Sequence, residues 1–338
     1  MVNPENTPVD ALVVVSFGGP EGPDDVIPFL ENVTRGRNIP RDRLAAVGAH
    51  YDLFGGVSPL NEQCRELVAA LEAALTARDD DLPVYWGNRN WHPMLVDTVT
   101  QMADDGIERA VAFVTSAYSS WSGCRQYLDD IERARALAGP NAPVIEKLRP
   151  FHDHPGFVDP FVDSVMAAIH QLPANRRAAA EIAFTAHSIP ESMAAGCDYR
   201  TQLRTTADLI LDRIDGPRTS HLVFQSRSGP PHVPWLEPDI GDHLRARSSA
   251  GAEAVVMVPI GFTSDHMEVV YDLDTEAAAI ADELDLPVTR AATPGTDSRF
   301  VSMVLDLVDE RRRATTAVAL GPSGPRPMPC RDDCCPPG

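Results

Sequence analysis

Short apolar runs alternate with longer amphipathic stretches along most of the 338 residues. The apolar runs predict β-strands near residues 11–16, 83–87, 109–116, 143–148, 181–186, 220–225, 254–260 and 287–291. The stretches between them have the helical period, and they predict helices near residues 60–77, 93–105, 123–138, 156–171, 198–215, 236–248, 271–284 and 297–313. Strands that alternate with helices indicate parallel sheets with right-handed crossovers.

The spacing of the predicted strands indicates two similar lobes, because four strands precede residues 150–175 and four follow them. The first gap, between the strands that start at residues 11 and 83, is about one structural unit too long. The excess, about residues 35–58, is predicted to be an insertion, and insertions in compact α/β proteins usually carry function. The predicted fold is therefore α/β, with two Rossmann-like lobes that each contain a doubly wound, four-stranded parallel sheet.

The predicted insertion concentrates positive charge on an acidic chain. The formal net charge is −20 at pH 7, yet Arg35, Arg37, Arg41 and Arg43 lie close together in the insertion. Such a cluster predicts a local site for an anionic group. A solubilising loop is the other interpretation that the composition leaves open.

The rest of the composition is typical of a globular protein, with 43% hydrophobic and 23% charged residues. The negative charge argues against non-specific binding to nucleic acid or anionic lipid, which need a positive surface. We see no apolar run of the roughly 18 residues that a membrane span needs, and no secretory signal at the N-terminus. We therefore expect a cytoplasmic protein whose six cysteines are thiols or metal ligands.

The segment GFTSDHMEVVYDLDTE, which follows a predicted strand, carries the most informative polar pattern. It places Glu268, Asp272 and Glu276 four residues apart, so that on an α-helix the three carboxylates line one face. His187 ends another predicted strand, and open α/β sheets keep their sites at the carboxyl ends of strands. One imidazole and a row of carboxylates could bind a borderline metal ion such as Fe(II). A solvated helix face and a capping or core histidine are the alternatives.

Two glycine-containing turns are candidate binding loops. Ser58 follows Gly55 and Gly56, whose small size allows a ligand to approach closely. The sequence SFGGP follows the first predicted strand but lacks the spaced glycines of a dinucleotide site, so we reject that function.

The last residues form a segment rich in proline and glycine that contains Cys330, Cys334 and Cys335. These three thiols and a fourth from elsewhere would make a four-thiolate site for an iron–sulfur cluster or zinc. A disordered tail with incidental cysteines is the alternative.

Five motifs together resemble the ferrochelatase family, whose members insert ferrous iron into a porphyrin. They are SFGGPEGPDDV, GGVSPLN, FTAHSIPE, QSRSGPPHVPWLEPD and PIGFTSDHMEVVYDLD. The resemblance implies two Rossmann-like lobes with a cleft between them, in agreement with the strand pattern. The expected ranges are 1–150 for the N-terminal lobe with its porphyrin-binding insertion, 151–320 for the C-terminal lobe with the metal site, and 321–338 for the cysteine-rich tail.

The resemblance also implies roles for the polar residues of the C-terminal lobe. His187 and Glu268 match the catalytic metal-site pair of the family, and either can take a pyrrole proton. Asp272 and Glu276 match an acidic path for metal ions or protons.

For the porphyrin, Ser58 and Tyr127 match positions that hold propionates in the family branch acting on coproporphyrin. Many relatives in that branch have Tyr where Phe17 stands and Arg where His50 stands, which gives Arg35 and its neighbours more weight as propionate ligands. The aromatic side chains expected to line the porphyrin are those of Phe17, Trp91 and Trp235.

Coproporphyrin III is the expected substrate, because the chain shows no apolar lip or membrane anchor and a substrate with four propionates needs neither. Protoporphyrin IX is the alternative substrate. The alternative functions are a cobalt chelatase for an early tetrapyrrole and a porphyrin or haem carrier without turnover. The expected partners are porphyrin and ferrous iron, with the next enzyme of the haem pathway as the protein partner.

Some ferrochelatases carry a [2Fe–2S] cluster held by three C-terminal cysteines and one internal cysteine. By this resemblance Cys124 joins Cys330, Cys334 and Cys335, with Cys197 as the second choice for the internal ligand and zinc as the alternative occupant. Cys64 lies on a predicted helix and is expected to be buried filler.

Overall fold

The computed structural model describes residues 8–36, 39–327, 330 and 334–337 of the chain. The chain divides into two compact units. Unit 1 contains Met1–Thr115, Gln126–Leu148 and Val304–Ala317. Unit 2 contains Ser116–Arg125, Arg149–Met303 and Val318–Gly338. Each unit is therefore assembled from segments that are distant in the sequence.

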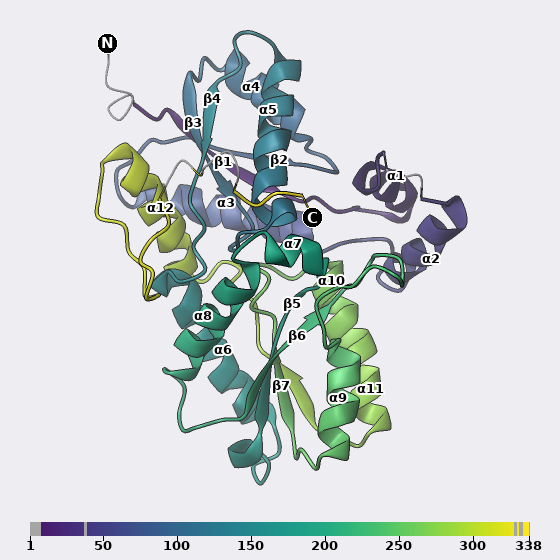
Figure 1. Ribbon diagram of the computed structural model, residues 1–338. Coiled ribbons are helices and arrows are strands. Elements are labelled where there is room, and N and C mark those ends of the chain that lie inside the picture. Colours follow the sequence, from purple (N-terminus) through teal and green to yellow (C-terminus); the bar gives the residue numbers. More distant parts are fainter. Residues whose placement is uncertain (1–7, 37–38, 328–329, 331–333, 338) are drawn as a thin grey trace. The chain divides into compact units, whose positions relative to one another are not determined.

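Unit 1 is built on a four-stranded parallel sheet in the order β2-β1-β3-β4 (Figure 1). Its strands are β1 (Ala11–Ser16), β2 (Val84–Asn88), β3 (Arg109–Val114) and β4 (Val144–Lys147). Its helices are α1 (Pro23–Val33), α2 (Arg41–Asp52), α3 (Leu60–Thr76), α4 (Leu95–Asp104) and α5 (Gln126–Ala138). Apolar side chains of α4 and α5 pack on the sheet and form the main core of this unit.

Unit 2 repeats the same topology, with the strand order β6-β5-β7-β8. Its strands are β5 (Glu181–His187), β6 (Ser220–Gln225), β7 (Val255–Val258) and β8 (Val288–Arg290). Its helical segments are the π-helix η2 (Trp121–Arg125), α6 (Pro155–Gln171), the 3-10 helix η3 (Arg177–Ala179), α7 (Glu191–Ala195), α8 (Tyr199–Leu211), α9 (Ile240–Ser249), α10 (Met267–Val270), the π-helix η4 (Asp272–Ala277) and α11 (Ala278–Glu283). The last helix, α12 (Ser298–Arg312), begins in unit 2 and ends in unit 1.

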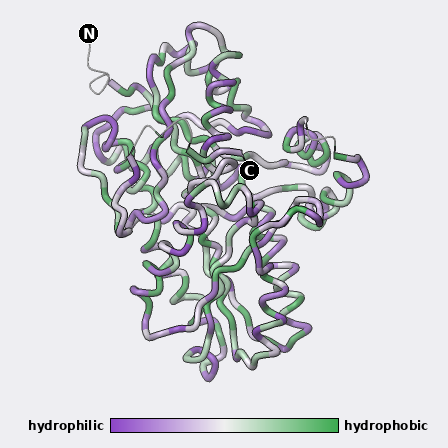
Figure 2. The backbone as a smooth tube through the Cα atoms, viewed as in Figure 1, coloured by the Kyte–Doolittle hydropathy of each residue, from purple (hydrophilic) through white to green (hydrophobic). Residues whose placement is uncertain are grey.

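The central strands are apolar because helices cover both faces of a parallel sheet. Every residue of β1 is buried, as are the first six of β5 and all of β7. The strands are accordingly largely green in Figure 2, whereas purple segments gather in the helices and loops. Polar side chains that follow a buried strand are thus placed at its carboxyl end.

The predicted α/β class with two four-stranded parallel sheets is confirmed, and each predicted strand overlaps an observed one. The predicted insertion at residues 35–58 contains a helix, α2, which the sequence reading did not assign. Within the described part of the chain, no helix is both long enough and apolar enough to cross a membrane.

Candidate functional site

His187 and Glu268 lie together at the carboxyl edge of the sheet in unit 2. His187 is the last residue of β5, and Glu268 lies in the first turn of α10, which follows β7. Since β5 and β7 are neighbouring parallel strands, their ends meet at one edge. His187 Nε2 lies 3.4 Å from Glu268 Oε1, and the two side chains are 32% and 42% exposed. This pair was predicted from the sequence as the metal site.

The pair has the electrostatics of an imidazolium and a carboxylate. Burial alone would lower the pKa of His187, but the Glu268 carboxylate and the Ser188 carbonyl raise it to about 9. Burial alone would raise the pKa of Glu268, but the His187 ring lowers it to about 2. With both ring nitrogens protonated, Nδ1 donates to the Ser188 carbonyl and Nε2 faces Glu268. His187 must therefore lose a proton before it can bind a metal ion.

His266 contacts the opposite side of Glu268 and caps α10. Its Nδ1 accepts a hydrogen bond from the Glu268 backbone N–H at 3.1 Å, and its Nε2 lies 3.8 Å from Glu268 Oε2. Burial is the first cause that lowers the pKa of His266. A neutral imidazole fits this capping role, because only a neutral ring offers an acceptor nitrogen.

The carboxylate row after Glu268 lies partly in a π-helical turn. The N–H of Glu276 bonds to the carbonyl of Tyr271, five residues earlier, in the π-helical pattern. The expectation of one regular α-helix was therefore wrong, and side chains four residues apart are not stacked here as they would be on an α-helix. Glu276 is exposed, whereas Asp272 is half-buried.

Asp272 differs from Glu268 in its protonation. Burial, assisted by the charges of Glu268 and Glu276, raises the pKa of Asp272 to about 7. The Ser226 hydroxyl donates to Asp272 Oδ2 from a residue with a left-handed backbone, φ 61°. Side chains without glycine's freedom seldom adopt this conformation, so the surrounding structure must hold it.

Gln225 ends β6 beside His187 and Ser226 follows it, and sequence reasoning gave neither residue a role. Gln225 is buried, and its Nε2 donates to the backbone carbonyl of Glu268. The sequence could have indicated them, because they lie at the carboxyl end of a predicted strand, and His187 had been placed at the same edge of the sheet.

In unit 1, Phe17 and Trp91 belong to one aromatic cluster. Both pack edge-on against Phe29, with ring centroids 6.2 and 6.3 Å apart. Tyr51 of α2 makes a similar contact with Phe29 at 6.0 Å. The cluster brings Phe17 and Trp91 together, and their predicted role in lining the porphyrin stays a prediction.

Tyr127 is buried, and the guanidinium of Arg89, a residue to which the sequence gave no role, lies over its ring. The Arg89 guanidinium carbon lies 4.3 Å from the centre of the Tyr127 ring and 5.9 Å from that of Phe17. Arg89 is also paired with Asp130 at 2.5 Å, and its side chain is 6% exposed. Burial raises the pKa of Tyr127, so its phenol stays neutral. Arg89 directly follows β2, which was the signal that could have found it.

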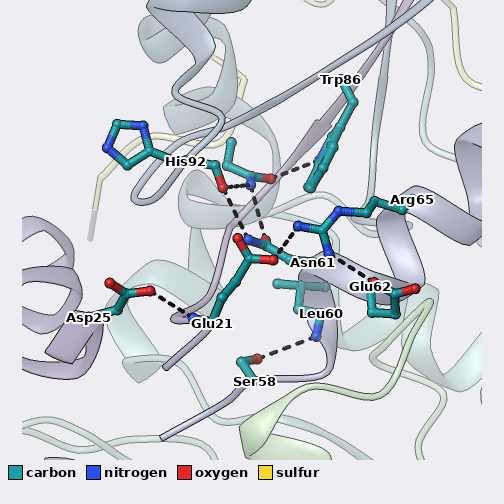
Figure 3. Close-up of polar contacts among 10 residues, drawn as sticks. Glu21, Asp25, Ser58, Leu60, Asn61, Glu62, Arg65, Trp86 and His92 are labelled. Atoms are coloured by element: carbon teal, nitrogen blue, oxygen red, sulfur yellow. Dashed lines mark hydrogen bonds and ion pairs between the residues drawn. The ribbon is translucent and has the colours of Figure 1, made fainter. Parts of the chain in front are cut away.

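An amide network fixes the turn that carries Arg89 and Trp91 (Figure 3). Asn61 and Asn88 donate to the His92 carbonyl at 3.0 and 3.1 Å, and Asn88 also donates to Asn61 Oδ1 at 3.1 Å. Trp86 Nε1 donates to Asn88 Oδ1 at 3.0 Å. Buried and satisfied amides of this kind hold a turn in one conformation.

Ser58 lies beside this network, and its hydroxyl is buried. Ser58 Oγ accepts from Leu60 N at 3.4 Å, and its backbone N–H donates to the Pro20 carbonyl at 2.8 Å. A Cβ on Gly19 would lie 2.7 Å from Ser58 Oγ, so only glycine permits this approach. The predicted role of the Ser58 hydroxyl in propionate binding stays a prediction.

The basic residues of the predicted insertion lie on and before α2. Arg35 is exposed and its Nη2 donates to Asn32 Oδ1 at 2.5 Å, while Arg41 pairs with Glu31 at 3.4 Å. His50 is half-buried in the last turn of α2. Arg37 lies outside the described residues.

Trp235 lies in unit 2, in the loop between β6 and α9. It lines a pocket of about 350 Å³ whose other lining residues are Glu191, Arg200, Arg204, Leu222, Phe224, Pro234 and Glu237. His187 and Glu268 are not among them, so this pocket does not unite Trp235 with the metal-site pair.

Cys335 and Cys334 of the C-terminal segment lie near Cys124. Cys334 Sγ lies 3.5 Å from Cys335 Sγ, and the buried Cys335 thiol also hydrogen-bonds with Cys124, which is the first cause that raises its pKa. Burial raises the pKa of Cys197, and the charge of the nearby Cys334 thiol adds to this effect. Cys330 is half-buried. The structure thus brings both candidate internal cysteines near the tail.

Across the described residues, no group of three or more His, Cys, Asp or Glu side chains is arranged to hold a metal ion. Cys64 is buried in α3, and burial is the first cause that raises its pKa to about 11.

Comparisons with known proteins agree on one family. The sequence model of the ferrochelatase family matches residues 9–312. A coproporphyrin III ferrochelatase of Streptomyces coelicolor is 53% identical, over 98% of this chain and 94% of the relative. One of Frankia alni is 54% identical, over 97% of this chain and 87% of the relative. A protein named ferrochelatase from Rhodopirellula baltica is 50% identical, over 98% of this chain and 94% of the relative.

Solved structures resemble the chain in fold. A multi-domain protein of Deinococcus radiodurans with structural similarity to chelatases has a TM-score of 0.51 and 15% identity, over 90% of this chain and 56% of that chain. The sirohydrochlorin chelatase SirB of Bacillus subtilis subspecies spizizenii, in complex with cobalt, has a TM-score of 0.50 and 10% identity. The match covers 90% of this chain and 96% of that chain. At these identities the likeness concerns the fold alone.

Proposed function

Because this chain belongs to the ferrochelatase family, we propose that it inserts ferrous iron into coproporphyrin III in haem biosynthesis. Relatives about half identical over nearly the whole chain carry the name coproporphyrin III ferrochelatase, which supports the substrate. The observation in the structure that carries the proposal is the His187–Glu268 pair at the carboxyl edge of β5 and β7.

The reaction requires a group that takes protons and binds a borderline metal. Each insertion replaces two pyrrole protons by one Fe(II), and iron must exchange its water ligands for ring nitrogens. We assign His187, once its Nε2 proton has left, as the imidazole that meets the metal or a pyrrole proton, because nitrogen ligands suit Fe(II). Glu268, which is ionised beside it, stabilises the imidazolium after proton transfer.

The carboxylates provide a graded route for the released protons. Glu268 holds a proton poorly, because its pKa is lowered to about 2, whereas Asp272 can both hold and release one near neutral pH. Glu276 is exposed and can pass the proton to water. We assign Asp272 and Glu276 to this path.

Unit 1 supplies the residues that we assign to the porphyrin. The aromatic cluster around Phe17 and Trp91 offers apolar ring surface. Arg35 is exposed and can bind a propionate, since its guanidinium forms a fork suited to a carboxylate. Ser58 keeps the propionate-binding role that the family resemblance implies, and we also assign to the porphyrin His50, which stands where many relatives have Arg. Binding energy from the propionates can hold the ring in a distorted form that accepts iron.

The substrate assignment is tested by anaerobic incubation of the purified protein with Fe(II) and either coproporphyrin III or protoporphyrin IX. The Soret absorption reports both binding and metallation. We expect many turnovers with coproporphyrin III and few with protoporphyrin IX. Preference for protoporphyrin IX would overturn the branch assignment. Stoichiometric binding without turnover would support a carrier, and turnover with cobalt and an early tetrapyrrole alone would support the rival chelatase.

We further propose that Cys124, Cys330, Cys334 and Cys335 hold a [2Fe–2S] cluster. Thiolates are the donors that such clusters use, and contacts among Cys124, Cys334 and Cys335 support the choice. When bound, the cluster would supply an iron–sulfur centre that links the tail to the rest of unit 2. Cys197 is the alternative internal ligand, and zinc is the alternative occupant.

The test of this assignment is the visible absorption of the purified protein, combined with iron, zinc and acid-labile sulfide analysis. One cluster per chain would give two irons and two sulfides. Zinc without sulfide would exclude the cluster and retain the four-cysteine site. Loss of colour in Cys197→Ser but not in Cys124→Ser would show that Cys197, and not Cys124, is the internal ligand.

A further inference from the structure

Two buried tyrosines of unit 2 hold backbone carbonyls near the carboxyl ends of β5, which ends at His187, and of β7, which leads to Glu268. The Tyr199 hydroxyl donates to the carbonyl of His187 at 3.0 Å, and the Tyr118 hydroxyl donates to the carbonyl of Ile260 at 2.9 Å. The rings pack edge-on with centroids 5.9 Å apart and an interplanar angle of 85°. Tyr118 is 2% exposed and Tyr199 is 7% exposed.

The sheet itself leaves the His187 carbonyl without a strand partner. The Ser188 N–H donates to the Gln225 carbonyl of β6. The His187 carbonyl, which belongs to the same peptide group, therefore points the other way, toward β7. The last pair between β5 and β7 joins Phe184 to Val258, and β7 ends there. A carbonyl beyond this point needs another donor if it is buried, and Tyr199 provides one.

Ile260 lies at the start of the segment that leads from β7 to Glu268, two residues after the strand ends. Its carbonyl is held by Tyr118, and the next residue, Gly261, donates from its N–H to the Thr185 carbonyl of β5 at 3.0 Å. A Cβ on Gly261 would lie 2.7 Å from the backbone of Ala186, so this segment lies directly on β5. The start of the Glu268 segment is thereby fixed relative to β5.

The tyrosine pair is itself firmly held on α8. Gln202 bonds to both groups of Ser119, accepting from its N–H at 2.7 Å and donating to its hydroxyl at 2.9 Å. Thr206 Oγ1 lies 3.3 Å from the Tyr118 hydroxyl and donates to the His152 carbonyl at 2.8 Å. Both tyrosines are therefore held by α8, because Tyr199 is its first residue and the Tyr118 hydroxyl lies against Thr206 of the same helix.

We propose that Tyr118 and Tyr199 are positioning residues for iron insertion, which fix the backbones of His187 and of the Glu268 segment relative to each other. The inference rests on the proposed function of the His187–Glu268 pair. Each hydroxyl donates to a backbone carbonyl, so the pair acts through the backbone. A small displacement of two groups that must meet one metal ion is costly in rate, whereas porphyrin binding by other residues is preserved.

The experiment compares Tyr118→Phe, Tyr199→Phe and the double variant with wild type. We expect kcat to fall about tenfold in each single variant and KM for Fe(II) to rise, while KM for coproporphyrin III stays within about twofold. Because the two rings touch, the double variant should lose less than the product of the single losses. The matched control is Tyr85→Phe, which removes a hydroxyl that donates to Asp105 at 2.8 Å in unit 1 and should keep wild-type kinetics.

A second readout separates this inference from the proposed function. With ¹⁵N-labelled histidine, the ring resonances of His187, assigned through His187→Gln, should shift in Tyr199→Phe even without turnover. Unchanged His187 resonances and kinetics, accompanied only by a lower thermal unfolding midpoint, would reduce the pair to a structural role and overturn the inference. Failure of the wild type to metallate any porphyrin would instead overturn the proposed function, and the resonances would still decide the positioning.

Discussion

Replacing Glu268 by Gln should weaken His187 as a proton carrier, because it removes the charge that stabilises the imidazolium. Two unit charges 3.4 Å apart attract by roughly 5 kcal/mol at an effective dielectric constant of ~20. The raised His187 pKa, about 9 against an ordinary 6.5, would correspond to ~3 kcal/mol. Water screens this interaction, because the Glu268 side chain is 42% exposed and that of His187 is 32% exposed. We therefore expect the measured pKa of His187 to fall by about one unit, or ~1.4 kcal/mol.

The assay combines an NMR titration of the His187 ring with steady-state kinetics. Glu268→Gln should lower kcat by roughly a hundredfold, and Asp272→Asn and Glu276→Gln should lower it much less, since they lie further along the path. An unchanged His187 pKa in Glu268→Gln would refute the electrostatic account. Equal kinetic losses at all three positions would refute a directional path.

The remaining predictions concern the insertion, acid stability and the thiols. Arg35→Ala should raise KM for coproporphyrin several-fold and lower kcat less. An unchanged KM would show that Arg35 is only a solvated surface residue without a role in porphyrin binding. Burial, assisted by His221, lowers the pKa of His243 to about 4, so its contribution to stability is present above pH ~6.5 and is lost as the pH falls toward 4. Urea unfolding should show a loss of up to ~3 kcal/mol over that window, and His243→Gln should flatten it; an equal loss in the variant would contradict this. Cys124→Ser should bleach the visible absorption of the purified protein, whereas the control Cys64→Ser should not, and colour retained in the first variant would remove Cys124 from the ligand set.

The sheets could be predicted from sequence because their signal is local. Buried parallel strands are short apolar runs, and each predicted run overlaps an observed strand. His187 and Glu268 could also be predicted as neighbours, because His187 ends β5 and Glu268 lies in the first helix after β7. The helix α2 was missed because its apolar positions form only a weak helical pattern, with Leu44 and Gly48 as its buried residues.

The contacts that tune the site could not be predicted from local pattern. Ser226 reaches Asp272 across 46 residues, and Arg89 reaches Asp130 across 41 residues. Such pairings depend on which strand ends are adjacent in the folded sheet. The π-helical turn of the carboxylate row could not be predicted either, because its hydrogen bonds span only one residue more than those of an α-helix.

The central claim is that this chain inserts iron into coproporphyrin III through the His187–Glu268 pair. The most direct test measures the anaerobic rate of iron coproporphyrin formation by wild type and by His187→Ala, together with the dissociation constant of coproporphyrin III for each. The account predicts multiple turnovers by wild type, a rate below about a tenth of this in His187→Ala, and porphyrin affinities that agree within about an order of magnitude, or ~1.4 kcal/mol. Substantial turnover by His187→Ala, or none by the wild type, would contradict it.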